Sequence, residues 1–368
     1  MEENIGGDTV DLSTRLGKLS LSNPVMPASG PLTGDDKKML SIAAFGVGAM
    51  VTKTISTVAA KVPRPCIIAT NNHVVNTELW SEFSYERWLE EFIPAFREKS
   101  DLPLIVSLGY SPIDLEKLVP LFCKDADAFE LSTHYVADDP SLMEELISAV
   151  KRNSDRPVFL KLDPSVADPA AMVRAIEKAG GDGVVAINSL GPVYPYDAAL
   201  KRSPMGSGDG FGWVSGPAIK MLALSMVRRI REVTDLPVIG VGGIASAGDV
   251  VDFLSAGADA VQLLSGALIK GKDIYARIIS SLPKALESRG FNSVVEAVSS
   301  VRQPAQSFEV RNPVIDHDRC TRCGLCVSVC PYFALSLDER VEIDGEACFG
   351  CGLCQSRCPV GAIGGVLI

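Results

Sequence analysis

The sequence predicts an α/β protein in two parts, a closed (β/α)8 TIM barrel followed by a small cysteine-rich domain. Short apolar segments and helical segments alternate up to about residue 300. Glycines follow the last two of these apolar segments, and eight of the ten cysteines fall between Cys320 and Cys358. We expect the barrel to occupy residues 1–305 and the second domain residues 306–368.

The predicted barrel strands are apolar segments rich in Val, Ile and Ala. In chain order they are Pro24–Ala28, Ala49–Lys53, Leu104–Leu108, Ala128–Ser132, Val158–Leu162, Gly183–Asn188, Val238–Gly242 and Ala260–Leu264. Continuously apolar strands joined by helices are typical of a parallel sheet that is buried on both faces. Eight such units, with glycines after the seventh and eighth strands, favour a closed barrel over a doubly wound open sheet.

The segments around these strands follow from local signals. Leu12–Asn23 alternates in polarity and is expected to form a hairpin that closes the barrel bottom. Asp139 can cap a helix whose first residue is Pro140, with an apolar stripe from Met143 through Leu146 to Val150.

Two longer segments carry less regular patterns. Residues 190–213 are rich in Gly and Pro, contain Tyr194 and Tyr196, and are expected to form a long loop after the sixth strand. Long barrel loops are usually functional. Residues 271–313 are expected to form a last helix and a connector.

The cysteines form two runs with the same spacing. The first run is Cys320, Cys323, Cys326 and Cys330, and the second is Cys348, Cys351, Cys354 and Cys358, each followed by proline. This x2-x2-x3 spacing closed by Cys-Pro is the bacterial ferredoxin pattern, in which the fourth cysteine ligates the other cluster. Four-cysteine zinc sites also use x2 spacings, but two complete runs favour two 4Fe–4S clusters in a ferredoxin-like domain.

The predicted cluster ligands therefore cross between the runs. Cluster one is assigned to Cys320, Cys323, Cys326 and Cys358, and cluster two to Cys348, Cys351, Cys354 and Cys330. Cys66 and Cys123 lie outside both runs and are expected to be buried apolar side chains.

Composition excludes several classes of protein. The net charge is −10, from 35 Lys and Arg against 45 Asp and Glu, which argues against sequence-independent binding of nucleic acid. The chain contains no run of eighteen apolar residues, so no membrane span is expected. The first residues are acidic and lack an apolar signal core, so a cytoplasmic location is expected by default.

The strand ends carry the residues expected to do chemistry, because barrel active sites lie at the carboxyl ends of the strands. Gly242 and Gly243, and then Ser265 and Gly266, could let backbone N–H groups approach a phosphate. The alternative is a pair of tight turns. Two lysines near strand ends, Lys53 and Lys161, need a partner, either a bound anion such as a reduced flavin or a carboxylate of the protein.

These strand-end sequences resemble a known family. The matching segments are Asn23–Gly30, Val51–Thr54, Asn76–Leu79, Lys161–Val166, Ala186–Ser189, Val214–Ile219 and Val241–Ile244. They are similar to the dihydroorotate dehydrogenase and dihydropyrimidine dehydrogenase flavoproteins. The resemblance spans nearly the whole chain, because bacterial dihydropyrimidine dehydrogenase catalytic subunits join such a barrel to a two-cluster tail.

The resemblance implies FMN as the cofactor and assigns residues to it. Residues implied along the flavin ring are Ala28, Ser29, Thr52, Lys53 and, at N1 and O2, Lys161. Residues implied around the ribityl chain and phosphate are Gly216, Gly242, Gly243, Ser265 and Gly266. Residues implied for substrate hydrogen bonds are Asn76, Glu78, Ser132, Asn188 and Ser189, with Asn188 also next to the cofactor.

The catalytic loop departs from the family pattern. After the fourth strand the family has Glu-Leu-Asn-x-Ser-Cys-Pro, whereas this chain has Glu-Leu-Ser-Thr-His-Tyr-Val over residues 130–136. Ser132 replaces the substrate-binding asparagine, and Tyr135 replaces the acid/base cysteine. We predict that Tyr135 donates the proton that accompanies reduction of a C=C bond, with His134 as the second candidate. A third possibility is that no side chain of this loop acts as the acid.

The sequence therefore favours an iron–sulfur flavoprotein oxidoreductase that acts on a CH–CH/C=C couple of a small polar substrate. No dinucleotide-binding glycine motif follows a strand, so a ferredoxin or a separate FAD/NAD(P)H-oxidising subunit is the expected electron partner. Alternatives are a dihydropyrimidine or dihydroorotate dehydrogenase, or a non-catalytic electron-transfer subunit. The resemblance also implies a homodimer or hetero-oligomer.

Overall fold

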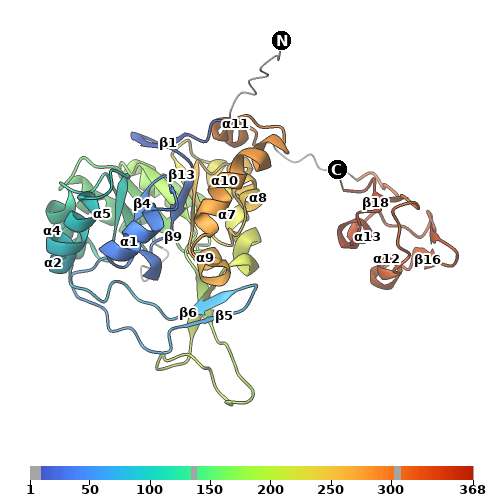
Figure 1. Cartoon of the computed structure of the whole chain (residues 1–368), viewed down its shortest axis with the longest axis horizontal. Helices are drawn as coiled ribbons and strands as arrows, with labels where there is room; N and C mark the ends of the chain where they lie inside the picture. Colours follow the sequence, from blue (N-terminus) through green and yellow to red (C-terminus); the bar gives the residue numbers. More distant parts are fainter. Residues whose placement is uncertain (1–9, 134–138, 302–307, 368) are drawn as a thin grey trace, which may run out of the picture. The chain divides into compact units, whose positions relative to one another are not determined.

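The computed structural model describes residues 10–133, 139–301 and 308–367. The chain divides into two compact units, Met1–Val301 and Arg302–Ile368 (Figure 1). The expected boundary between residues 305 and 306 lies outside the described residues.

In its described part, the first unit contains one sheet of eight parallel strands (Figure 1). These are β3 (Val25–Pro27), β4 (Met50–Val51), β7 (Leu104–Leu108), β8 (Ala128–Ser132), β9 (Val158–Leu162), β10 (Gly183–Ala186), β13 (Val238–Val241) and β14 (Ala260–Leu263). Neighbours in the sheet follow chain order, and the last strand, β14, pairs with the first, β3. The predicted TIM barrel and its eight strand positions are confirmed.

The sheet closes between β3 and β4, where two strands approach very closely. The Gly48 N–H donates to the Val25 carbonyl at 2.9 Å. A Cβ atom on Gly48 would lie 2.0 Å from the Asn23 carbonyl oxygen, so only glycine permits this contact. The Asn23 side chain donates to the Gly46 carbonyl at 2.9 Å and holds the same turn.

Helices surround the strands. They are η1 (Pro31–Thr33), α1 (Asp36–Ala43), α2 (Tyr85–Arg87), η2 (Trp88–Phe92), α3 (Ile93–Arg97), α4 (Pro112–Phe122), α5 (Pro140–Lys151), α6 (Pro169–Lys178), η3 (Pro217–Ile219), α7 (Lys220–Arg231), α8 (Ala247–Ala256), α9 (Ser265–Lys270), α10 (Ile274–Glu287) and α11 (Val294–Ser299). The expected start of α5 is confirmed, because the Asp139 carboxylate accepts the Ser141 N–H at 2.9 Å. Its stripe, Met143, Leu146 and Val150, is buried. The connector that was expected to hold one helix holds both α10 and α11.

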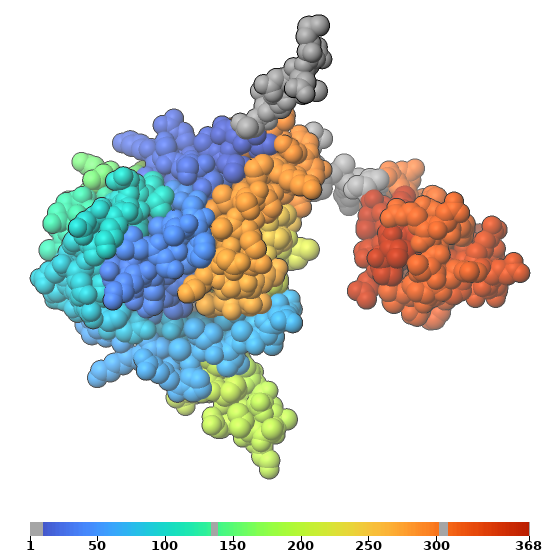
Figure 2. Space-filling model, in the orientation of Figure 1, coloured from blue at the N-terminus to red at the C-terminus, as the bar shows by residue number. Residues whose placement is uncertain are grey.

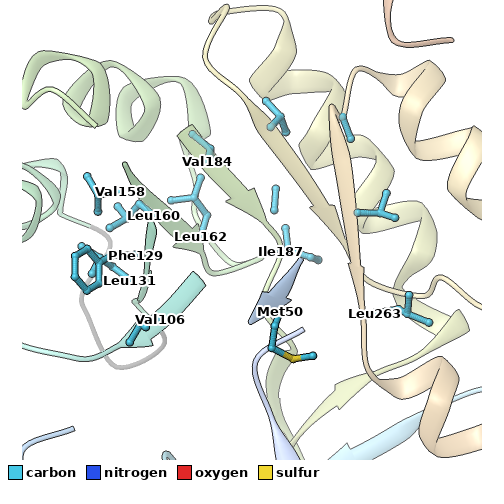
Figure 3. Close-up of a cluster of buried hydrophobic side chains, with 14 of the residues drawn as sticks. Met50, Val106, Phe129, Leu131, Val158, Leu160, Leu162, Val184, Ile187 and Leu263 are labelled. Carbon is cyan, nitrogen blue, oxygen red and sulfur yellow. The ribbon is translucent and has the colours of Figure 1, made fainter. Parts of the chain in front are cut away.

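Side chains alternate between two apolar cores along each strand. On β9, Val158, Leu160 and Leu162 pack in the outer core between sheet and helices (Figure 3). Phe159 belongs to the inner core of the barrel. Lys161 shares the face of Phe159 and is buried, so the strand period directs a lysine into the barrel interior near its carboxyl end.

The expected hairpin closes the amino-terminal end of the barrel. β1 (Thr14–Leu16) pairs antiparallel with β2 (Leu19–Leu21). Leu16 and Leu21 are buried in the inner core, so the hairpin seals that core from below.

The long segment after the sixth strand is not a simple loop, contrary to expectation. Its ends form β11 (Leu190–Val193) and β12 (Gly212–Ser215), and these join β6 (Val74–Asn76) and β5 (Ile67–Ala69) in a four-stranded antiparallel sheet. The segment between β11 and β12 projects from the barrel in Figures 1 and 2. The sequence did not predict these strands for two reasons. Gly and Pro are frequent in this segment and are typical of loops. The strand β6, with which β12 pairs, also lies far away in the sequence.

The second unit has the small two-fold repeat expected of a ferredoxin-like domain. β15 (Val314–Ile315) pairs with β18 (Ile363–Gly364), and β16 (Leu335–Leu337) pairs with β17 (Val341–Ile343). The short helices α12 (Leu325–Val329) and α13 (Leu353–Arg357) lie one in each cysteine run. Among the helices that the structure describes, none has the length and apolar character needed to cross a membrane.

Candidate functional site

A cavity with about 1140 Å³ of empty space, part of it open to solvent, lies at the carboxyl ends of the barrel strands. Most sequence-predicted site residues line it. They are Ala28, Ser29, Lys53, Asn76, Glu78, Ser132, Lys161, Asn188, Ser189, Gly242, Gly243, Ser265 and Gly266. The fold therefore brings together residues that were assigned to cofactor and substrate from eight separate segments.

Four predicted residues are not in the described wall of the cavity. The Thr52 hydroxyl is turned to the backbone and accepts the Ser107 N–H at 2.9 Å. Gly216 follows Ser215, which does line the cavity. His134 and Tyr135 lie outside the described residues.

The cavity wall also holds residues that the sequence interpretation did not assign. Tyr110 lines the cavity just after β7, and its ring meets Trp80 edge-on at a centroid distance of 5.5 Å. Glu130, on β8, is buried in the same wall. The sequence contained a signal for both residues, because they lie at or near the carboxyl ends of predicted strands, where barrel active sites are expected.

Lys161 belongs to a buried polar triad inside the barrel. Its Nζ donates to Glu130 Oε1 at 3.3 Å and to Gln262 Oε1 at 3.2 Å, while Gln262 Nε2 donates to Glu130 Oε2 at 2.6 Å. All three side chains project inward from β9, β8 and β14. The structure thus satisfies this lysine with a carboxylate, which is the alternative to a bound anion that the sequence left open.

Lys53 is held by two carboxylates at the edge of the same cavity. Its Nζ lies 2.9 Å from Glu78 Oε2 and 2.9 Å from Glu82 Oε2, and its side chain is 3% exposed. The Cys66 thiol donates to Glu78 Oε1 at 3.5 Å. Burial and the neighbouring Glu78 charge raise the pKa of Cys66. Cys66 and Cys123 are partly exposed, so the expectation that both are buried is wrong.

The glycine loop after β13 fits a phosphate. Gly243 adopts φ +77°, and a Cβ atom there would lie 2.6 Å from Lys220 Cβ, so the loop needs glycine. Among the described residues, the N–H groups of Gly243 and Ile244 have no acceptor from the protein. Amide donors without partners at a cavity wall are the chemistry that binds a phosphate group.

An ion-pair cluster fixes this loop from behind. Asp249 accepts the Ala245 N–H at 2.9 Å and contacts the Lys220 ammonium, which also lies 2.6 Å from Asp252. Partial burial opposes these charges, but the Lys220 hydrogen bond lowers the pKa of Asp249, and the two aspartates raise the pKa of Lys220. Both groups are therefore charged at neutral pH and hold the loop in one conformation.

Substituting Gly243 with alanine is expected to weaken FMN binding roughly tenfold, because the new methyl group strains the loop that presents the amides. Fluorescence titration of the apoprotein with FMN measures this. Gly290→Ala is the matched control, since Gly290 also has a positive φ, +82°, but an added Cβ meets no atom within 4 Å. Equal FMN affinity in the two variants would contradict the prediction.

Two smaller cavities lie in the second unit, and each is lined by four cysteines. One wall contains Cys320, Cys323, Cys326 and Cys358. The other contains Cys330, Cys348, Cys351 and Cys354. These are the two ligand sets that the crossed pattern predicts, with the fourth cysteine of each run at the other cavity.

The donor set suits iron–sulfur clusters better than zinc. In the part of the chain that the structure describes, no three Cys, His, Asp or Glu side chains approach closely enough to hold a single metal ion. A tetrahedral zinc site would bring four sulfurs around one ion at about 2.3 Å. Four thiols around a cavity instead match a cluster that lies between them.

Comparison with known proteins defines the class. The family model "Dihydroorotate dehydrogenase" matches residues 11–286, and the model "4Fe-4S dicluster domain" matches residues 319–362. A barrel of this type binds FMN, and the dicluster domain holds two 4Fe–4S clusters. Barrel, cavity and cysteine sets together define an iron–sulfur flavoprotein oxidoreductase that acts on CH–CH groups.

Within that class, the chain belongs to the dihydroorotate dehydrogenase family. It is 33% identical over 298 residues to the dihydroorotate dehydrogenase B (NAD(+)) catalytic subunit of Pyrococcus abyssi, over 78% of this chain and 98% of the relative. The protein of the same name from Methanothermobacter thermautotrophicus is 33% identical over 299 residues, covering 78% and 97%. The Oceanobacillus iheyensis protein of that name is 30% identical, covering 78% and 98%. These relatives are dihydroorotate dehydrogenase B subunits, whereas the sequence interpretation placed the chain nearest to dihydropyrimidine dehydrogenase.

Proposed function

We propose that this protein interconverts a C=C and a CH–CH bond in a small, uncharged polar molecule. Electrons would pass between its two 4Fe–4S clusters and FMN in the barrel. FMN, when bound, exchanges two electrons with carbon and single electrons with the clusters. The residues of the chain must bind the substrate, exclude charged competitors and supply the proton.

The charge balance of the cavity carries the proposal of an uncharged substrate. The charged side chains in its described wall are Lys53, Glu78, Glu130 and Lys161. Lys161 is paired with Glu130, and Lys53 is paired with Glu78. A substrate carboxylate would therefore have to compete with Glu130 for Lys161 or with Glu78 for Lys53. It would also lose its hydration without gaining a free cation as a partner, which is unfavourable. A neutral amide or imide would only need hydrogen bonds.

Two asparagines in the wall suit such a neutral polar group. Asn76 is fixed, because its amide donates to the Trp213 carbonyl at 3.3 Å and its Oδ1 accepts the Glu78 N–H at 3.2 Å. Asn188 Oδ1 accepts the Ser189 N–H at 2.8 Å, and its amide faces no acceptor among the described residues. These residues favour a cyclic amide, of which a dihydropyrimidine is one example.

Dihydroorotate is the second candidate substrate, because the relatives are named for it. It carries a carboxylate, and the paired lysines weigh against it. The two candidates are separated by adding uracil and orotate anaerobically to dithionite-reduced protein and following flavin reoxidation. The proposal expects reoxidation by an uncharged acceptor; reoxidation by orotate alone would overturn it in favour of the second candidate.

The proton donor in this proposal is Tyr135, which stands where the family has a cysteine. A tyrosine can protonate a developing carbanion even with an ordinary pKa of about 10. His134 is the second candidate from the same loop. Tyr110 is the third candidate, because it lies in the described wall of the cavity, next to Trp80.

Replacing Tyr135 with phenylalanine is expected to lower the rate of substrate reduction about 10²–10⁴-fold, with FMN content unchanged. Stopped-flow measurement of flavin reoxidation by substrate gives that rate. Tyr110→Phe, made in parallel, identifies which phenol acts. If Tyr135→Phe turns over like the wild type while Tyr110→Phe does not, the proton comes from the loop after β7.

The electron partner is proposed to be a ferredoxin or a separate FAD-containing, NAD(P)H-oxidising subunit. The relatives are named as catalytic subunits of an NAD(+)-linked enzyme, and the dicluster domain of this chain handles single electrons. NADH alone should therefore leave the flavin of the purified chain oxidised, while reduced ferredoxin or dithionite should bleach it. Direct bleaching by NADH would contradict the proposed partner.

A further inference from the structure

The ion pair at Lys53 differs from the ion pair at Lys161 in its charge. Lys161 meets one carboxylate, so that pair is neutral. Lys53 meets two carboxylates, Glu78 and Glu82, each at 2.9 Å, so that group has one negative charge in excess. The group formed by Lys53, Glu78 and Glu82 at the cavity edge therefore carries net negative charge.

Glu82 contributes this extra charge from outside the cavity. It is 37% exposed and is not part of the described wall, whereas Lys53 and Glu78 are. Although partial burial opposes it, the hydrogen bond from Lys53 lowers the pKa of Glu82, so the carboxylate is ionised at neutral pH. Lys38 adds a weaker attraction to Glu82 and is itself paired with Asp35 at 2.6 Å.

The chain segment that carries Glu82 is held rigidly. The neighbouring Ser81 is buried, its N–H donates to the Thr54 carbonyl at 2.8 Å, and its hydroxyl accepts the Trp88 indole N–H at 2.8 Å. Trp88 is fully buried, so this anchor cannot move without opening the outer core. The backbone beside Glu82 is therefore fixed, and its carboxylate lies 2.9 Å from the Lys53 ammonium.

We propose that Glu82 is a positioning residue that sets the substrate charge specificity of the cavity. Together with Glu78 it takes two of the three N–H donors of Lys53 and more than cancels the lysine's charge. One N–H donor remains for a neutral carbonyl group, while a carboxylate would meet net negative charge. This inference rests on the proposed function, because it assumes that FMN and a small polar substrate share this cavity.

The experiment compares Glu82→Gln with wild type in the FMN-loaded full chain. Glutamine keeps the size of the side chain and an oxygen that accepts from Lys53, and removes only the charge. The midpoint potential of the bound FMN should rise, because added positive charge favours the reduced flavin. The ratio of the dissociation constant of orotate to that of uracil, from perturbation of the flavin spectrum, should fall roughly tenfold.

Two further variants separate the charge of Glu82 from a structural role. Glu90→Gln removes an exposed carboxylate from the nearby helical segment η2 without touching Lys53, so both readouts should stay at wild-type values. Glu82→Asp restores the charge and should return the potential most of the way. A potential that is the same in Glu82→Gln, Glu90→Gln and wild type overturns the proposal, as does an unchanged ligand ratio.

The same measurements distinguish failure of the inference from failure of the proposed function. If neither uracil nor orotate perturbs the flavin in any variant, a pyrimidine-type substrate is excluded. The midpoint potential of the bound FMN then still shows whether the charge of Glu82 acts on the cavity, because that measurement needs no substrate. If the apoprotein takes up no FMN, the proposed function itself fails.

Discussion

Replacing Glu130 with leucine is expected to lower the free energy of unfolding of the barrel by about 3–5 kcal/mol. The substitution leaves the Lys161 ammonium with one neutral partner, Gln262, in a site where the lysine side chain is 7% exposed. An ammonium stripped of its carboxylate in a low-dielectric interior is among the most destabilising single changes. Urea unfolding followed by tryptophan fluorescence measures the loss, because Trp80, Trp88 and Trp213 all lie in the first unit.

The double variant Glu130→Leu with Lys161→Met tests whether the unpaired charge is the cause. Replacing a whole buried pair with apolar side chains of similar size is often nearly neutral, so most of the lost stability should return. Glu91→Leu is a surface control, because Glu91 pairs with Arg87 where both side chains are about half exposed, and its loss should cost under about 1 kcal/mol. A double variant as unstable as Glu130→Leu would show that cavity formation, not the charge, sets the effect.

The barrel could be predicted because its signals are local. Each strand is buried on both faces and therefore reads as a short apolar run, and each predicted run overlaps its observed strand within two residues at either end. The cap at Asp139 and the hairpin at Leu12–Asn23 also depend on neighbouring residues alone. The cysteine spacing is equally local, because a short curled backbone must present three thiols to one cluster.

The polar contacts of the site could not be predicted, because they join distant segments. Lys161 and Glu130 are 31 residues apart, and Gln262 reaches Glu130 across 132 residues. Their meeting depends on the parallel register of β8 and β9 and on closure of the barrel through β14. The sequence therefore predicted that Lys161 needs a partner, but it could not predict that the partners are Glu130 and Gln262. The pairing of β12 with β6 was hidden for the same reason.

The crossed ligand sets give the second large effect. Cys330 belongs to the first cysteine run, but it lines the cavity of Cys348, Cys351 and Cys354. Cys330→Ser is therefore expected to remove cluster two and about half of the protein-bound iron, since a 4Fe–4S cluster needs four thiolates. Iron and acid-labile sulfide analysis after anaerobic purification measures this, and FMN content reports whether the barrel remains intact. Cys123→Ser, in the first unit, should change neither value.

Double variants decide which cysteines share a cluster. Cys330→Ser combined with Cys348→Ser should lose no more iron than Cys330→Ser alone, because both residues lie at one cavity. Cys330→Ser combined with Cys358→Ser should lose nearly all of it, because Cys358 lies at the other cavity. Nearly complete loss in both pairs would instead mean that each run holds its own cluster, because Cys348 and Cys358 both lie in the run that lacks Cys330. The crossing has a consequence for stability of the clusters, because each run then supplies ligands to both, and damage to either run affects both clusters.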